Sequence, residues 1–398
     1  MINTMAGGTG AGPAARGEPG SCTAYPASHF PGEFLQESSP FYVGSEGQLV
    51  KPRPAHDIVP VMASSSNIQS WLRPERAGLY CEPGDFYIDP HAPVARAVIT
   101  HGHSDHARPG HGAVLATADT LAIMRLRLGA NALGTTQALA YGEAVRVNGV
   151  EVRLAPAGHI LGSAQVVIEY QGQRAVISGD YKRHPDPTCE PFELVPCDLF
   201  VTEATFGLPV YRHEPDTSEV AKLLASLRDF PDRTHQVGVY GLGKCQRLIS
   251  LLRQAGYDRP VWLHGALRAM TDYYVARGFA LGDVPSVADA ADKLAGEIVL
   301  SPPSALGDRW SRRFADPLSG FASGWMRIRG RVRQRGVELP LIISDHCDWH
   351  ELLSTITETG AGEVWVTHGR EEALVHEMGK RGIIARALRL VGREDDPE

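Results

Sequence analysis

The positions of apolar residues predict an alternation of strands and helices that begins near Trp71. The apolar run at residues 94–100 predicts a buried strand, and the spacing at residues 118–128 predicts a helix. Val150, Val152 and Leu154 alternate with polar residues, as on a strand with one buried face. Residues 164–170 and 174–178 predict a hairpin around a Gln-Gly-Gln turn. Residues 199–202 predict a further short strand that ends at Glu203.

A second block of alternating elements lies in the middle of the chain. Residues 217–257 predict a helix, a strand and a helix, and residues 260–264 and 266–277 add a strand and a helix. Residues 341–344 and 363–367 return to buried strands, and both end at a polar cluster. This order predicts an α/β catalytic domain that an inserted α/β domain divides.

Composition limits the classes of protein to which this chain can belong. The 398 residues are 43% hydrophobic and contain no apolar run long enough to span a bilayer, so we expect no membrane association. The net charge of -7 does not suit a protein that coats nucleic acid, although an acidic enzyme can hold a polyanion along a local groove. Scattered cysteines without a CxxC pair, and the lack of a secretory leader, indicate a reduced, cytoplasmic protein. Residues 1–66 open with Gly, Ala and Pro and predict a disordered extension.

The strongest chemical signal is the histidine-rich segment that follows the first predicted strand. His101, His103, Asp105 and His106 are crowded into one short loop, which suits a loop that folds around metal. Imidazole together with carboxylate favours zinc or manganese over calcium. The spacing is too tight for all of these side chains to hold one ion, so the natural arrangement is two pairs that face two ions. A polar surface loop that happens to be rich in histidine is the plainer alternative.

Two further residues could complete such a site. His159 lies in AGHILGS, where the flanking glycines allow the backbone to approach closely. Asp180 follows a predicted strand in SGD, and a carboxylate there could bridge two ions. Taken alone, each would more often be an ordinary loop histidine or turn aspartate.

In this order, HxHxDH, GH and SGD resemble the motifs of the metallo-β-lactamase superfamily. Asp89, in YIDP, resembles the leading aspartate of that superfamily, which supports the histidine loop without holding metal itself. Glu203 in VTEATFG, His346 in SDHCD and His368 in VTHG resemble the later motifs of its β-CASP nucleases. The resemblance covers nearly the whole chain after residue 70 and is greatest to bacterial ligase-associated DNA exonucleases. It extends to RNA 3′-end-processing nucleases and to DNA cross-link repair nucleases.

This resemblance implies an α/β fold, the metallo-β-lactamase αββα sandwich, with an inserted α/β cap domain of the β-CASP type. The implied segments are the first part of the core at residues 67–206, the cap at 207–337 and the second part of the core at 338–398. It also implies a centre of two divalent metal ions, Zn2+ or alternatively Mn2+. The implied ligands are His101, His103 and His159 for one ion, Asp105, His106 and His368 for the other, and Asp180 as the bridge.

The resemblance further implies that a hydroxide shared by ions about 3.5–4 Å apart attacks phosphorus in line, with Asp105 among the catalytic residues. His346 is the implied general acid for the leaving oxygen, and Glu203 orients it or raises its pKa. An ordinary structural hydrogen bond between the two is the alternative. Asp345 stands where relatives commonly carry a small residue, which predicts a more basic His346. The implied products are a 5′-phosphate and a 3′-hydroxyl.

Basic residues are candidates for holding a polyanionic substrate. Lys182 and Arg183 follow Asp180 directly, and Ser163 is a further candidate. A segment from residue 309 to 335 mixes arginine with aromatic residues, which suits a groove with stacking surfaces. Its arginines are Arg309, Arg312, Arg313, Arg327, Arg329, Arg331, Arg333 and Arg335, and its aromatic residues include Trp310, Phe314, Phe321 and Trp325. The alternation from residue 327 to 333 could equally be the solvated face of a strand.

The segment GVYGLGKC at residues 238–245 nearly matches the phosphate loop of NTPases, and it also resembles the start of the β-CASP cap helix. Cys245 stands where Ser or Thr should hold magnesium, and no clear Walker B strand follows, so we expect no NTP hydrolysis. Lys244, at the predicted helix start, could still hold a phosphate of the substrate.

The function that these features favour is a metal-dependent nuclease, specifically a DNA exonuclease in DNA repair. The resemblance implies association with a DNA ligase and a helicase. An RNA-processing endo- or exonuclease of the same mechanism is the alternative, because the sequence does not show contacts to a 2′-hydroxyl. A small-molecule metallo-hydrolase would need neither the cap nor the late motifs. A non-catalytic scaffold would be expected to have lost metal ligands, and none is missing.

Overall fold

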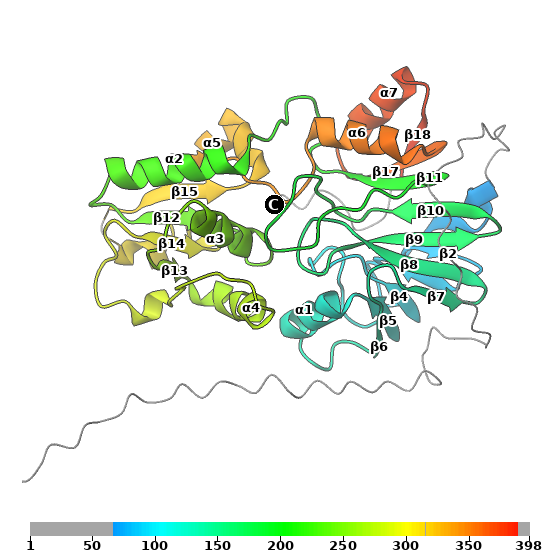
Figure 1. Ribbon diagram of the computed structural model, residues 1–398, viewed down its shortest axis with the longest axis horizontal. Helices are drawn as coiled ribbons and strands as arrows, with labels where there is room; N and C mark the ends of the chain where they lie inside the picture. The colour runs from blue at the N-terminus through cyan, green and yellow to red at the C-terminus, as the bar shows by residue number, and fades with distance from the viewer. Residues whose placement is uncertain (1–66, 315, 389–398) are drawn as a thin grey trace, which may run out of the picture. The chain divides into compact units, whose positions relative to one another are not determined.

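The computed structural model describes residues 67–314 and 316–388, all within one compact unit (Figure 1). Within this described part, the strands form sheets of 6, 7 and 5 strands, which confirms the α/β class. No helix in the same part is long and apolar enough to cross a bilayer, and every cysteine in it is a free thiol. The predicted disordered extension at residues 1–66 lies outside the described residues.

The first two sheets are built from the outer parts of the chain. The first sheet contains, in spatial order, β1 (Leu72–Glu75), β2 (Gly78–Cys81), β3 (Phe86–Ile88), β4 (Arg96–Val98), β5 (Ala113–Ala116) and β6 (Thr135–Ala138). The second contains β18 (Ile384–Ala387), β17 (Glu363–Gly369), β11 (Leu199–Ala204), β10 (Gln173–Ile177), β9 (Ala164–Tyr170), β8 (Val150–Pro156) and β7 (Ala144–Val147). The predicted hairpin is the antiparallel pair β9 and β10.

These two sheets lie face to face, with helices on their outer surfaces (Figure 1). Val98 of the first sheet and Val166 of the second belong to the buried cluster between the sheets. Their chain neighbours Ala97 and Val167 point outwards, toward α1 (Ala118–Leu128) and toward α6 (Trp349–Thr359) and α7 (Glu371–Lys380), respectively. Burial on both faces explains why several of these strands read as continuous apolar runs.

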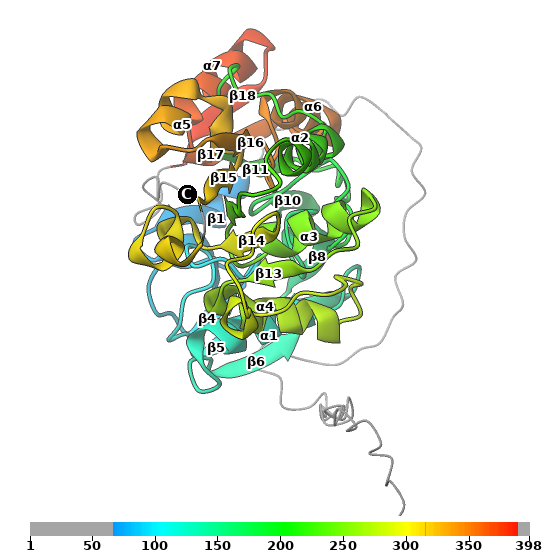
Figure 2. The same cartoon turned by 90° about the vertical axis from the view of Figure 1, so that its left-hand side faces the viewer.

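The third sheet is parallel throughout and comes from the middle of the chain. Its spatial order is β13 (Val261–Leu263), β14 (Ile298–Ser301), β12 (His235–Gly238), β15 (Leu318–Ala322) and β16 (Leu339–Leu341). One face packs in a buried cluster with α2 (Asp216–Asp229), α3 (Lys244–Gln254) and α4 (Gly265–Ala276). The other face packs against η6 (Gly324–Arg327) and α5 (Arg329–Arg335). Figure 2 shows α2, α3, α4 and α5 around the strands of this sheet.

The parallel pairing of β11 with β17 joins the two outer parts of the chain across the middle block. Its register places Glu203 opposite Thr367, and a bulge then places Ala204 opposite Gly369. Glu203 and His368, which are far apart in sequence, therefore lie at the same end of adjacent strands.

One predicted strand was wrong, and one alternative that the sequence left open is not the observed structure. Residues 342–344 are not a strand, because side chains occupy their backbone groups: Ile342 N donates to the Glu219 carboxylate, and the Ser344 carbonyl accepts from Arg247. Residues 327–333 are not a strand with a solvated face but the end of η6 and most of α5, since arginine is a good helix former. β16 pairs with β15 in the third sheet, although it lies just beyond the predicted cap boundary at residue 337.

Candidate metal centre

The histidine loop begins where β4 ends, and Asp89 anchors its base. The Asp89 carboxylate accepts from the backbone N–H of Thr100 at 2.8 Å, from the Thr100 hydroxyl at 2.6 Å and is 2.7 Å from His106 Nδ1. Asp89 has a φ of 42°, an uncommon value for a residue that is not glycine. The predicted supporting role of Asp89 thus has matching contacts.

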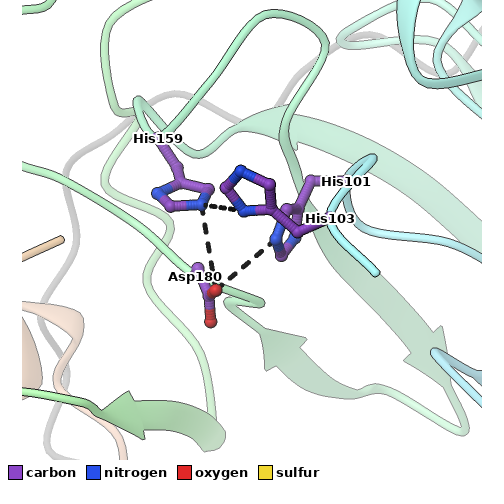
Figure 3. A group of neighbouring side chains, drawn as sticks. All are labelled: His101, His103, His159 and Asp180. Carbon is purple, nitrogen blue, oxygen red and sulfur yellow. Dashed lines mark hydrogen bonds and ion pairs between the residues drawn. The ribbon is translucent and has the colours of Figure 1, made fainter. Parts of the chain in front are cut away.

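One group of possible ligands contains His101, His103, His159 and Asp180 (Figure 3). Asp180 Oδ2 lies 3.4 Å from His101 Nε2 and 3.8 Å from His159 Nε2. His159 Nε2 in turn lies 3.0 Å from His103 Nδ1. These side chains converge from three separate loops, after β4, β8 and β10.

A second group contains Asp105, His106, Asp180 and His368. His106 Nε2 lies 3.4 Å from Asp105 Oδ2 and 3.4 Å from Asp180 Oδ1, and His368 Nε2 lies 3.8 Å from Asp105 Oδ2. Asp180 therefore turns one carboxylate oxygen to each group. His368 has a φ of 61°, the kind of backbone strain that is often found at functional sites.

The residues present fit divalent cations. His101 Nε2 and Asp180 Oδ1 are buried and have no hydrogen-bond partner among the described residues, a state that costs free energy unless a further group completes it. Burial, followed by the charge of His106, lowers the pKa of His101 to about 4. Burial also lowers the pKa of His159, and the nearby His346 adds to this effect. Neutral imidazoles beside ionised carboxylates are the donor set that zinc and manganese bind.

The nitrogens of these histidines that face away from the centre are also held. His106 Nδ1 meets Asp89, His159 Nδ1 lies 2.8 Å from the Asp345 carbonyl, and His103 Nε2 lies 3.2 Å from the Leu242 carbonyl. Because each oxygen accepts a hydrogen bond from a ring N–H, the opposite nitrogen presents a lone pair to the centre.

Glu203 and His346 form a buried pair beside the first group. His346 Nδ1 lies 2.9 Å from Glu203 Oε2 and 3.1 Å from Oε1, and Oε1 also accepts from the Tyr181 backbone N–H at 2.8 Å. The His346 ring centre is 4.6 Å from that of His159. A small pocket is lined by Glu203 together with Asp180, His106 and His368 of the second group.

The expected effect of Asp345 on His346 stays a prediction, and the structure adds a second charged partner for Asp345. The Asp345 carboxylate lies 2.9 Å from Lys244 Nζ, and both of these side chains are buried. Burial opposes the ionisation of Asp345, but the charge of Lys244, followed by those of His159 and His346, keeps the pKa of Asp345 well below its ordinary value.

The residues predicted to contact substrate do not share one environment. Ser163, a candidate substrate contact, is buried, and its hydroxyl accepts from the backbone N–H groups of His159 and Ile160. Lys182 is buried near the His346 loop, whereas Arg183 pairs with Glu358 at 2.8 Å.

Several arginines next to the third sheet are exposed. Among them are the candidate substrate contacts Arg309, Arg312 and Arg313. The guanidinium of Arg313 lies over the ring of Trp310, 4.8 Å from its centre. The prediction had also missed Arg247, whose only sequence signal is its place shortly after the phosphate-loop-like segment.

Comparison with known proteins gives partial matches, and no family model matches the chain. A "Probable DNA ligase" of Opitutus terrae is 29% identical over 316 residues, which cover 78% of this chain and 30% of that protein. The "Endoribonuclease YSH1" of Eremothecium gossypii is 33% identical over 116 residues, covering 28% of this chain and 15% of that one. The "Cleavage and polyadenylation specificity factor subunit 3" of Dictyostelium discoideum is 30% identical over 128 residues, covering 31% and 16%.

This chain thus spans less than a third of the length of these relatives. A solved structure from Enterococcus faecalis V583, a protein of unknown function, superposes with a TM-score of 0.50 at 12% identity, over 75% of this chain and 80% of that one. The sequence relatives agree with the resemblance that the motifs indicated, to the β-CASP branch of the metallo-β-lactamase superfamily.

Proposed function

We propose that this protein is a DNA exonuclease that hydrolyses phosphodiester bonds at a centre of two divalent metal ions, with zinc as the first choice and manganese as the alternative. The observation that carries this proposal is the position of Asp180, which turns Oδ2 to one histidine group and Oδ1 to the other. A carboxylate placed between two imidazole-rich groups suits a pair of cations.

The proposed ligands are His101, His103 and His159 for one ion, Asp105, His106 and His368 for the other, and Asp180 for both. Bound divalent ions would lower the pKa of a coordinated water and offset negative charge on the phosphate. Asp89, placed beneath the loop, holds His106 in the orientation that directs Nε2 to the centre.

His346 is the proposed general acid for the leaving oxygen. Its Nδ1 is held by Glu203, so Nε2 is the atom that would carry the proton to the leaving group. Glu203 is itself fixed by the Tyr181 N–H, which keeps the pair in one orientation. If the hydrogen bond between Glu203 and His346 has a structural role only, catalysis should instead survive the loss of the His346 imidazole.

The layering of the chain supports a metallo-β-lactamase sandwich with a β-CASP-type cap. Helices flank two facing sheets, and the third sheet enters the chain between β11 and β17, which pair with each other. We propose the core at residues 67–206 and 338–398 and the cap at 207–337, with β16 completing the cap sheet.

We propose DNA and not RNA as the substrate because the relative named as a DNA ligase is similar to more of this chain than the relatives named as endoribonucleases. The relative named as a DNA ligase matches 78% of this chain, whereas the endoribonuclease matches 28%. The same relative motivates association with a ligase, and a helicase partner rests on the family resemblance alone. An RNA-processing nuclease of the same mechanism is the second candidate, since a relative named as an endoribonuclease is 33% identical over 116 residues.

The test compares end-labelled single-stranded DNA, duplex DNA and RNA of matched sequence, incubated with protein loaded with zinc or manganese. Asp105→Ala serves as the metal-site control. We expect a DNA ladder that shortens stepwise from one end and is absent with the variant. Preferred cleavage of RNA would favour the second candidate, and failure to cut any polynucleotide would refute the nuclease proposal.

A further inference from the structure

The segment Leu242–Arg247 leads into α3 in the third-sheet part of the chain, yet it contacts the loops of the metal centre. We call it the α3 entry segment. Its sequence suggests a phosphate loop, but its side chains and backbone groups are directed to protein partners instead. Those partners are adjacent to His103, His159 and His346.

The start of the α3 entry segment lies directly against the histidine loops. The Leu242 carbonyl lies 3.2 Å from His103 Nε2. Gly243 follows with a φ of 85°, and a Cβ at this position would come within 2.3 Å of Ile160 Cγ2. Only glycine therefore permits so close an approach to the residue that follows His159.

Lys244 holds the loop that supports His159. Its ammonium lies 2.9 Å from the Asp345 carboxylate, and these residues are only 1% and 2% exposed. The backbone carbonyl of Asp345 lies 2.8 Å from His159 Nδ1. The ion pair thus fixes the residue whose carbonyl orients a proposed metal ligand.

Arg247 holds the same loop one residue earlier. Its fully buried guanidinium donates to the Ser344 carbonyl at 2.6 Å, pairs with Asp216 and lies 3.5 Å from Asp186. The Ser344 hydroxyl in turn accepts from the His346 backbone N–H at 3.1 Å. Because acidic partners surround this guanidinium, it is committed to the protein and is not available to a substrate phosphate.

We infer that the α3 entry segment is a positioning element for the metal centre, in which Lys244 and Arg247 seat the His346 loop and the Leu242 carbonyl orients His103. The inference rests on the proposed function. It assigns to the cap a part in forming the metal centre as well as in holding substrate, and it replaces the expected phosphate contact of Lys244. Residues that orient metal ligands by hydrogen bonds on the side away from the metal typically contribute about 10–100-fold to metal affinity or activity.

The central test is the double variant Lys244→Met/Asp345→Asn, which removes both buried charges at nearly constant volume and so avoids leaving one charge unpaired. Zinc affinity is measured by competition with a chromophoric chelator, and KM and kcat are measured on single-stranded DNA. We expect the double variant to stay folded by circular dichroism, to bind zinc at least about tenfold more weakly, and to lose kcat with little change in KM.

Arg253→Met is the matched control on the same helix. The Arg253 guanidinium donates to the carbonyls of Tyr257, Arg259, Leu281 and Asp283, all within the third-sheet part. We expect this variant to melt at a lower temperature but to bind zinc as the wild type does.

Wild-type zinc affinity in the double variant would overturn the inference. An equal loss of affinity in Arg253→Met would also overturn it, because the effect would then reflect general destabilisation. The zinc measurement is independent of nuclease activity, so a wild-type protein that cuts no polynucleotide would refute the proposed function while leaving this test intact.

Discussion

Replacing Asp89 with asparagine exchanges one carboxylate oxygen for an NH2 group beneath the histidine loop. Asparagine tolerates the positive φ of 42° at this position, so the backbone need not move. The new Oδ1 can still accept from the Thr100 N–H, and the Thr100 hydroxyl can rotate to accept from Nδ2. The contact that cannot survive is the one in which Asp89 accepts from His106 Nδ1 at 2.7 Å.

The His106 ring can respond to the loss of this contact in either of two ways. If His106 keeps its proton on Nδ1, a hydrogen bond to a charged acceptor disappears, at a cost of about 1.5–3 kcal/mol. If the proton moves to Nε2 instead, the ring presents N–H rather than a lone pair to the centre, 3.4 Å from Asp105 and Asp180. Since tenfold corresponds to about 1.4 kcal/mol, both routes predict metal affinity weaker by about 10–100-fold.

The assay is chelator competition on metal-free protein, combined with the metal content measured after dialysis. Asp85→Asn is the control: it also has a positive φ, of 52°, but its exposed carboxylate contacts only Tyr80 and Arg96 among the described side chains. We expect wild-type affinity in the control. Wild-type affinity in Asp89→Asn would refute the view that Asp89 selects the tautomer of a metal ligand.

Further outcomes follow from the same centre. His346→Asn should lower kcat by about 10²–10⁴-fold at unchanged metal content, and a structural role alone would leave kcat near the wild-type value. In metal-free protein, burial lowers the pKa of His101 from 6.5 to about 4, so the unfolded chain binds this proton first as the pH falls. The free energy of unfolding should thus be highest above pH 6.5 and should fall toward pH 4, with His101 contributing about 3 kcal/mol to the decrease. Urea unfolding at several pH values measures it. Removal of metal with EDTA should lower the melting temperature, by the equivalent of about 2.7 kcal/mol if free metal was at 100 times its dissociation constant; an unchanged melting temperature would contradict metal binding to the folded state.

Local patterns determined much of this protein in advance. The helix predicted at residues 118–128 is α1 with the same bounds, and the hairpin predicted around residue 172 is β9 and β10. The histidine loop was also predictable, because its imidazole and carboxylate side chains stand close together in sequence between residues 101 and 106. These features depend on neighbours along the chain, which a sequence displays directly.

Only the tertiary structure decided how distant segments meet. The sequence placed Asp345 next to His346, but it did not show that the buried Lys244, about a hundred residues earlier, pairs with the Asp345 carboxylate. The apolar run before Ser344 predicted a strand, but Arg247 and Glu219 take its backbone hydrogen bonds. Each of these outcomes depends on how the buried charged side chains are paired. Pairing is required because an unpaired charge costs far more free energy inside a protein than in water.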